Sequence, residues 1–232
     1  MRRNRHLRIA AVGAAVSLLG VGAPATAGWV SKACTNELHC YGRVLTRPSG
    51  MTALGATVNP SCLTAVKASA VTDEIWLAGA DLYWVEVGFV NKTKGVRING
   101  IPNGRSGFWA DQRPIDGRSP KHFNGHVLVR KPGMKARSLS IIRQGTTRYQ
   151  VSFGGVLGYS TDNTMKSPLQ GAVGSETFSK SNTSMAKFSG LKYAVGGGWI
   201  SGLPNRSYDR DSPQTFKWTN KPTVARAGIP CS

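Results

Sequence analysis

Two of the four glutamates in this sequence, Glu86 and Glu176, have surroundings that predict a chemical role. Residues 83–90 alternate as a strand does, with apolar side chains on one face and Glu86 on the other, because successive side chains of an extended chain point to opposite faces. Residues 171–178 repeat this arrangement around Glu176. We therefore expect the two carboxyl groups to meet across a sheet.

Two carboxyl groups that lie close together can perform acid–base catalysis. They cannot both ionise without a large electrostatic cost, so one pKa rises and the pair holds one proton at mildly acid pH. The ionised partner then takes a proton from water while the protonated partner donates one to a carbonyl oxygen or a leaving nitrogen. Such hydrolysis needs no metal, cofactor or covalent intermediate. The alternative is that each glutamate is a solvated strand residue paired with one of the thirty basic side chains.

Strands are the elements that must position these residues. From Glu74 onward, short apolar stretches alternate with breaks rich in Gly, Pro, Asn, Asp and Ser, and no long amphipathic helix is visible. This pattern predicts an all-β protein, an antiparallel β-sandwich of the jelly-roll, concanavalin-like type. The expected strands cover residues 41–45, 75–77, 82–91, 107–111, 126–130, 139–144, 148–154, 156–160, 172–179, 185–191, 195–199 and 215–218.

Four segments follow one another in an informative order: residues 84–89, 108–111, 149–159 and 174–176. They resemble, in turn, the Glu-x-Gly-Trp strand, the Tyr-Trp-Thr-x-Asp segment, the strand pair ending in Val-Gly-Tyr and the Gly-Gly-Glu of the glutamic peptidase superfamily. The resemblance is to its neprosin-like members, of a secreted actinobacterial type, and extends to the related eqolisins. It covers about half of the chain.

The resemblance implies a jelly-roll sandwich and an endopeptidase active at acid pH. Glu86 and Glu176 match the family's catalytic pair, although eqolisins have a glutamine at the first position. Trp84 and Trp109 would then wall the substrate groove, while Asp111 or Gln112 would orient a substrate group or hold Glu176.

Two further uses of the same residues stay open. Carboxylates and tryptophans on one sheet are also typical of sugar binding and glycoside hydrolysis. Jelly rolls occur in both kinds of protein, so the fold does not choose between them. The alternative function is a secreted, non-catalytic module that binds cell-wall material or polysaccharide.

The beginning of the chain predicts export. Residues 1–27 contain a basic start, an apolar run and the small-x-small site Ala25-Thr26-Ala27, which together indicate a signal peptide cleaved near Ala27. No later segment is long and apolar enough to predict a membrane span. We expect an N-terminal extension with a disulfide loop over residues 28–73, and the sandwich over residues 74–232, folded as a single globular domain.

The charge predicts anionic partners. The formal charge of +19 loses four arginines and no acidic residue with the first 27 residues, which leaves +15. This favours contact with an anionic cell-envelope polymer, beside a polypeptide substrate; no motif for specific nucleic-acid recognition is present. Because the basic residues are scattered, the charge could also serve solubility alone.

Four cysteines fit two disulfides in an exported protein. We favour Cys34 with Cys40, which closes a short loop, and Cys62 with Cys231, which ties the C-terminus to the body. Their spacing does not suggest a zinc site, so we expect no metal.

Other candidates are weaker. His122 and His126 have the spacing of a helical metal pair, but the stretch is interrupted by Gly125 and continues as a strand, so solvent-facing histidines are expected. Trp199, Trp218 and Phe216 are expected to be core or interface aromatics rather than ligand platforms.

Overall fold

The fold consists of two antiparallel sheets packed face to face. The computed structural model describes residues 39–231 apart from 81–82, 116–117 and 205. The first sheet contains, in spatial order, β13 (Arg206–Arg210), β1 (Cys40–Thr46), β10 (Gln170–Thr177), β3 (Ala70–Ala78), β4 (Trp84–Lys92), β5 (Gly104–Ile115) and β6 (Arg118–Arg130). The second contains β14 (Thr215–Asn220), β15 (Val224–Ile229), β11 (Thr183–Val195), β2 (Met51–Thr64), β7 (Arg137–Gln144), β8 (Arg148–Phe153) and β9 (Val156–Ser160), while β12 (Gly198–Ser201) pairs with β11.

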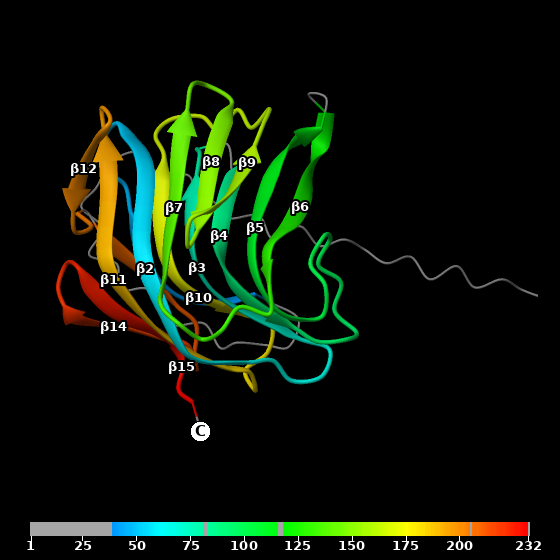
Figure 1. Ribbon diagram of the computed structural model, residues 1–232. Helices are drawn as coiled ribbons and strands as arrows, with labels where there is room; N and C mark the ends of the chain where they lie inside the picture. Colours follow the sequence, from blue (N-terminus) through cyan, green and yellow to red (C-terminus); the bar gives the residue numbers. More distant parts are fainter. Residues whose placement is uncertain (1–38, 81–82, 116–117, 205, 232) are drawn as a thin grey trace, which may run out of the picture.

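The predicted all-β sandwich is confirmed. Strands β2, β7 and β11 lie in front of β3, β4 and β10 in Figure 1, and the core fills the space between the two sheets. Val85, Val87 and Phe89 all point into this core with no exposed surface, as the alternation in β4 requires. Glu86 therefore lies on the outer face of the first sheet.

Residues 39–73 do not form a separate extension. β1 lies between β10 and β13, and the long strand β2 lies between β11 and β7, so both are inner strands of the sheets. Leu54 and Val58 of β2 are fully buried. Small or polar residues on the alternate positions of β2, from Ala53 to Asn59, hide this apolar face when composition alone is considered, which explains the difference from the expectation.

One expected strand is wrong. Residues 195–199 do not continue as a strand; β11 ends at Val195, and a turn through Gly196 and Gly197 leads into β12. Both glycines have positive φ, at 58° and 86°, a conformation that favours glycine and allows the chain to reverse direction here.

The predicted bond between Cys62 and Cys231 is present. It joins β2 to the segment after β15. Cys34 and the expected signal peptide lie outside the described residues, and none of the described cysteines is free. Within the described part of the chain, no helix is long and apolar enough to cross a membrane.

We expect the Cys62→Ala/Cys231→Ala double variant to lose about 2–4 kcal/mol of unfolding free energy, because a cross-link over a long loop restricts the unfolded chain. The two cysteines are separated by 169 positions. Urea unfolding of this variant beside the oxidised wild type measures the loss. A difference below about 1 kcal/mol would show that the C-terminal segment is held by its strand pairing instead.

Candidate active site

The site is built on the outer face of three adjacent strands, β10, β3 and β4. In β3, Thr72, Glu74 and Trp76 alternate with residues that face the core, so they share the outer face. The antiparallel register pairs Glu176 with Thr72 and Glu86 with Trp76. Because directly paired residues lie on the same face, all three glutamates project from the same side of the sheet.

Glycines on both sides of Glu74 provide the space in which the carboxyl groups converge. Glu74 is paired with Gly174 of β10 and with Gly88 of β4. A Cβ atom added to Gly88 would lie 2.3 Å from the Cβ of Glu74, and one added to Gly174 would lie 2.6 Å from the Cβ of Arg43. Because these two positions have no side chains, the neighbouring side chains have room to approach Glu74.

The three carboxyl groups form a compact, buried cluster. One oxygen from each of Glu74, Glu86 and Glu176 lies within 4.8 Å of the others. Glu74 is fully buried, and Glu86 and Glu176 are each 7% exposed. Glu74 accepts a hydrogen bond of 2.6 Å from the Thr72 hydroxyl, while its second oxygen is buried without a hydrogen-bond partner. The glutamate cluster defined by these three residues is the central feature of the site.

Burial and mutual repulsion keep protons on the cluster. Burial raises the pKa of Glu86 well above its usual range, and the charge of Glu176 raises it further. The Trp76 indole donates a hydrogen bond to Glu86, which opposes this rise. Burial likewise raises the pKa of Glu74 well above its usual range, with contributions from the charges of Glu86 and Glu176. The cluster thus holds neutral acid groups at a pH where isolated glutamates are ionised.

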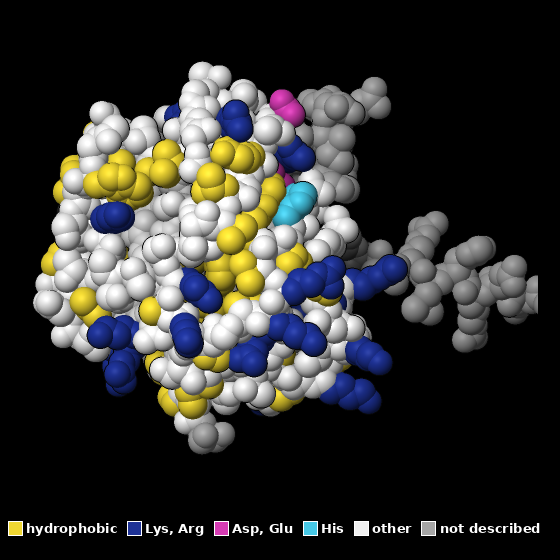
Figure 2. Space-filling view, viewed as in Figure 1, with side chains coloured by type: hydrophobic (Ala, Val, Ile, Leu, Met, Phe, Trp, Pro, Cys, Tyr) yellow, Lys and Arg dark blue, Asp and Glu magenta, His cyan; other side chains and the backbone are white. Residues whose placement is uncertain are grey.

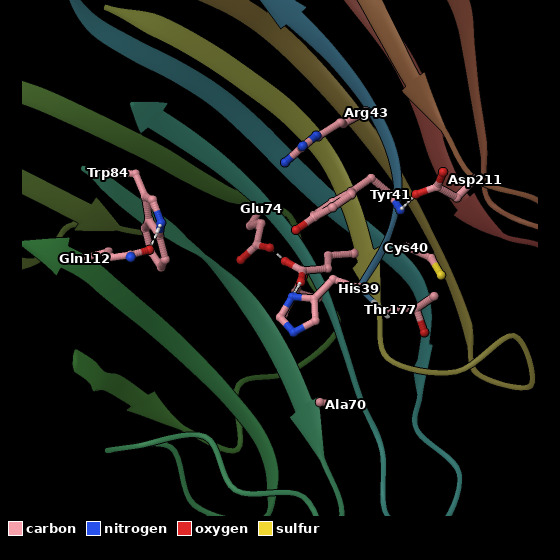
Figure 3. A network of polar contacts seen from close by, with 12 residues as sticks. His39, Cys40, Tyr41, Arg43, Ala70, Glu74, Trp84, Gln112, Thr177 and Asp211 are labelled. Carbon is pink, nitrogen blue, oxygen red and sulfur yellow. Dashed lines mark hydrogen bonds and ion pairs between the residues drawn. The ribbon is translucent and has the colours of Figure 1, made fainter. Parts of the chain in front are cut away.

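Three residues at the start of the described chain contact or border the cluster. His39 forms an ion pair with Glu176 through its Nδ1 atom. Burial lowers the pKa of His39, but the charge and hydrogen bond of Glu176 outweigh it and leave the pKa raised. Figure 3 shows the Tyr41 hydroxyl directed towards Glu74, with Arg43 above the ring of Tyr41 at 3.6 Å from its centroid.

Arg43 and Tyr41 are themselves held in place. The Arg43 guanidinium donates two hydrogen bonds, of 2.8 and 3.1 Å, to one oxygen of Asp209 in β13. Burial raises the pKa of Tyr41 well above its usual range, and the charge of Glu176 adds to this. Tyr41 is therefore a neutral hydroxyl that can donate a hydrogen bond beside the cluster.

Two of the predicted substrate-binding residues lie on the face of the cluster. Trp84 precedes Glu86 by two positions in β4 and is paired with Gln112 of β5. The Trp84 indole N–H donates a 2.7 Å hydrogen bond to the Gln112 side-chain oxygen (Figure 3). This pair borders the cluster on the side opposite to Tyr41, and both side chains are partly exposed.

Trp109 and Asp111 do not lie beside the cluster, and their expected position must be corrected. They are paired with Val87 and Val85, which face the core, so they face it too. Trp109 packs between the sheets, within contact distance of Gly158 in β9. Asp111 is fully buried and accepts a 2.6 Å hydrogen bond from the Ser160 hydroxyl.

Glu74, Trp76, Tyr41, Arg43 and His39 were not among the predicted site residues. A signal for the first two was present, because Glu74 and Trp76 are two positions apart in a stretch that alternates with Ile75 and Leu77. The other three come from β1 and the residue just before it, and the neighbour of β1 in the sheet is more than 120 positions away. No local pattern points to that pairing.

The cluster could also accept a cation. Carboxylate oxygens are the ligands that Ca²⁺ and Mg²⁺ prefer, and the three oxygens are close enough to share one ion. Protons compete for the same oxygens, because the pKa values of Glu74 and Glu86 are raised. Acid pH therefore favours the protonated cluster over a metal complex.

The whole architecture is similar to that of solved peptidases. A scytalido-glutamic peptidase, crystallised with a transition state analog inhibitor, superposes with a TM-score of 0.57 over 82% of this chain and 98% of that one, at 11% identity. SCP-B of the eqolisin family, in a complex with the tripeptide Ala-Ile-His, gives a TM-score of 0.53 over the same shares, at 10% identity. This chain has a glutamic peptidase-like fold. No protein-family profile and no curated protein matches the sequence.

At such low identity the likeness establishes the fold alone. The neprosin-like and actinobacterial character expected from the motifs stays a prediction, as does the catalytic role of Glu86 and Glu176.

Proposed function

We propose that this protein is a secreted, acid-active endopeptidase of the glutamic type, in which Glu86 and Glu176 act as acid and base. The observation that carries the proposal is the buried glutamate cluster, where carboxyl oxygens of both residues lie within 4.8 Å of each other. The peptidase-like fold and the partly exposed Trp84 and Gln112 beside the cluster support it. The disulfide between Cys62 and Cys231 is compatible with export.

The surroundings of the two glutamates suggest which role each takes. Glu86 holds its proton through burial and through the charge of Glu176, so it is the acid. Glu176 forms an ion pair with His39, and we assign it the role of the base. Glu176 removes a proton from water, and the water oxygen bonds to the carbonyl carbon. Glu86 donates its proton to the leaving nitrogen, the C–N bond breaks, and an amine and a carboxylic acid are released.

Tyr41 and Trp84 would assist without exchanging protons. The neutral Tyr41 hydroxyl can donate a hydrogen bond to the oxygen that becomes negative during attack. Trp84, fixed by Gln112, offers an apolar wall for a substrate side chain.

The experiment that tests the proposal is hydrolysis of casein by the mature chain between pH 3 and pH 8. We expect a maximum near pH 3–5, where one acid is ionised and another is neutral. A chelator should leave the rate unchanged, since no step uses a metal. Absence of casein hydrolysis over this whole range would contradict the proposal.

Glu74→Gln should leave most of the acid activity intact. Glu74 is fully buried and neutral at acid pH, so the neutral amide replaces it with little electrostatic change. We expect a loss of no more than about tenfold at pH 4, against the 10²–10⁴ that a general acid or base contributes. The alkaline limb of the pH–rate profile should stay in place, because burial and the charge of Glu176 are what raise the pKa of Glu86.

The pH–rate profile of Glu74→Gln distinguishes two roles. Retained activity with an alkaline limb that stays in place fits a residue that supports the pair without exchanging a proton. Loss of more than about 100-fold would instead assign the acid role to Glu74.

A further inference from the structure

Trp199 occupies an unusual position for a large aromatic residue. It was expected in the core or an interface, yet it is 42% exposed on the outer face of the second sheet, whereas Phe216 is buried. Its ring lies 3.3 Å from the Cβ position of Gly55 in β2, so it covers a strand residue that has no side chain. The Lys192 ammonium lies 4.6 Å from the ring centroid. These contacts fix the indole while part of its surface stays uncovered.

The ring forms one wall of a hollow with hydroxyl groups around it. The hollow has a volume of about 550 Å³, within the range of small-molecule sites. Its lining includes Trp199, Lys192 and four hydroxyl side chains from β2, β7 and the end of β12: Thr57, Ser138, Ser140 and Ser201. The register places Ser140, Gly55, Lys192 and Ser201 opposite one another across four strands. Apart from Lys192, the side chains of this row are therefore short or absent.

The chemistry of this hollow fits a sugar ring. The C–H face of a pyranose packs on an aromatic plane, and its hydroxyls exchange hydrogen bonds with serine, threonine and lysine. A nucleic acid would require several cations to neutralise its phosphates, but Lys192 is the one cation among the lining residues. In Figure 2, uncharged side chains cover most of the upper part of this face, and Lys and Arg gather towards its lower edge.

We propose that the hollow bounded by Trp199, Lys192 and the hydroxyls of β2 and β7 binds a pyranose chain of a polysaccharide. The hollow lies on the second sheet, whereas the glutamate cluster lies on the outer face of the first. The two sites face away from each other. Saccharide binding is thus independent of peptide hydrolysis and would hold the protein on a polysaccharide surface.

The test is titration of the mature chain with cellohexaose, xylohexaose and chitohexaose, followed by tryptophan fluorescence and calorimetry at 0.15 M salt. At least one sugar should bind, and Trp199→Ala should raise its Kd by about tenfold or more, as expected for loss of an aromatic stacking platform. Trp199→Phe keeps a ring and should bind more tightly than Trp199→Ala. Ser140→Leu, which fills the hollow without changing the tryptophan, should also weaken binding.

Two matched variants separate this site from the rest of the molecule. Ile200→Ala changes the exposed neighbour of Trp199 and should leave the Kd unchanged. Glu86→Gln should bind sugar as the wild type does, even where hydrolysis is lost. Failure of all three sugars to bind, or equal binding by Trp199→Ala, Ser140→Leu and the wild type, would overturn the proposal. Binding that disappears in 0.5 M salt but does not depend on Trp199 would assign it to surface charge instead.

Discussion

Glu86→Gln and Glu176→Gln should each lower kcat/KM for casein at pH 4 by about 1,000-fold, within the 10²–10⁴ that a general acid or base contributes. Glutamine keeps the size and hydrogen-bonding capacity of glutamate but cannot exchange a proton. The first variant removes the proton that burial keeps on Glu86. The second removes the carboxylate that pairs with His39. Initial rates of casein cleavage measure both effects.

The double variant and a surface control complete this experiment. Because an acid and a base act as a unit, Glu86→Gln/Glu176→Gln should be no slower than about the worse of the two single variants. Asp162→Asn removes an exposed carboxyl group at a φ of 58°, which asparagine also adopts, and should keep the wild-type rate. If either glutamine variant keeps more than about a tenth of the activity, the acid–base pair is wrong.

The free energy of unfolding should fall as the pH rises from 4 to 8, in part because of Asp73. This residue is fully buried between the sheets and accepts hydrogen bonds from Ser175 and from Ser184, the latter at 3.0 Å. Burial raises its pKa from 3.8 to about 7, although the two hydroxyls oppose the rise. The folded state therefore holds one more proton than the unfolded state between these two values.

The sign and size of the effect follow from that difference. The stabilisation is complete below pH 3.8 and is lost as the pH rises through about 7. At about 1.4 kcal/mol for each pKa unit, Asp73 accounts for up to about 4 kcal/mol. Glu74 and Glu86, whose pKa values are also raised, act in the same direction. The fold would thus be most stable at the acid pH of the proposed reaction.

Asp73→Asn isolates this contribution. The amide cannot ionise, so the variant should be more stable than the wild type at pH 8 and close to it at pH 4. Urea unfolding at intervals of one pH unit gives both curves, with Asp162→Asn as the charge-matched control. Parallel curves for Asp73→Asn and the wild type would mean that Asp73 is not the titrating group.

The sequence by itself determined the strand character and the faces of individual strands. Alternation in β4 and β10 places Glu86 and Glu176 opposite the core-facing residues, because an extended chain has a side-chain period of two. The same rule would have placed Glu74 and Trp76 on one face of β3. It would also have turned Trp109 and Asp111 towards the core, once β5 was aligned with β4.

Only the tertiary structure decided which strands are neighbours. β10 pairs with β3 and β1 with β10, although about 100 or more positions separate the paired residues. These pairings bring Glu74, Glu86 and Glu176 into one cluster and add His39 and Tyr41. The pairing of β11 with β2 and with β12 likewise places Trp199 over Gly55 on the other sheet. The physical reason is that a strand's pattern records which face is buried, whereas its neighbours are selected by the packing of the whole core.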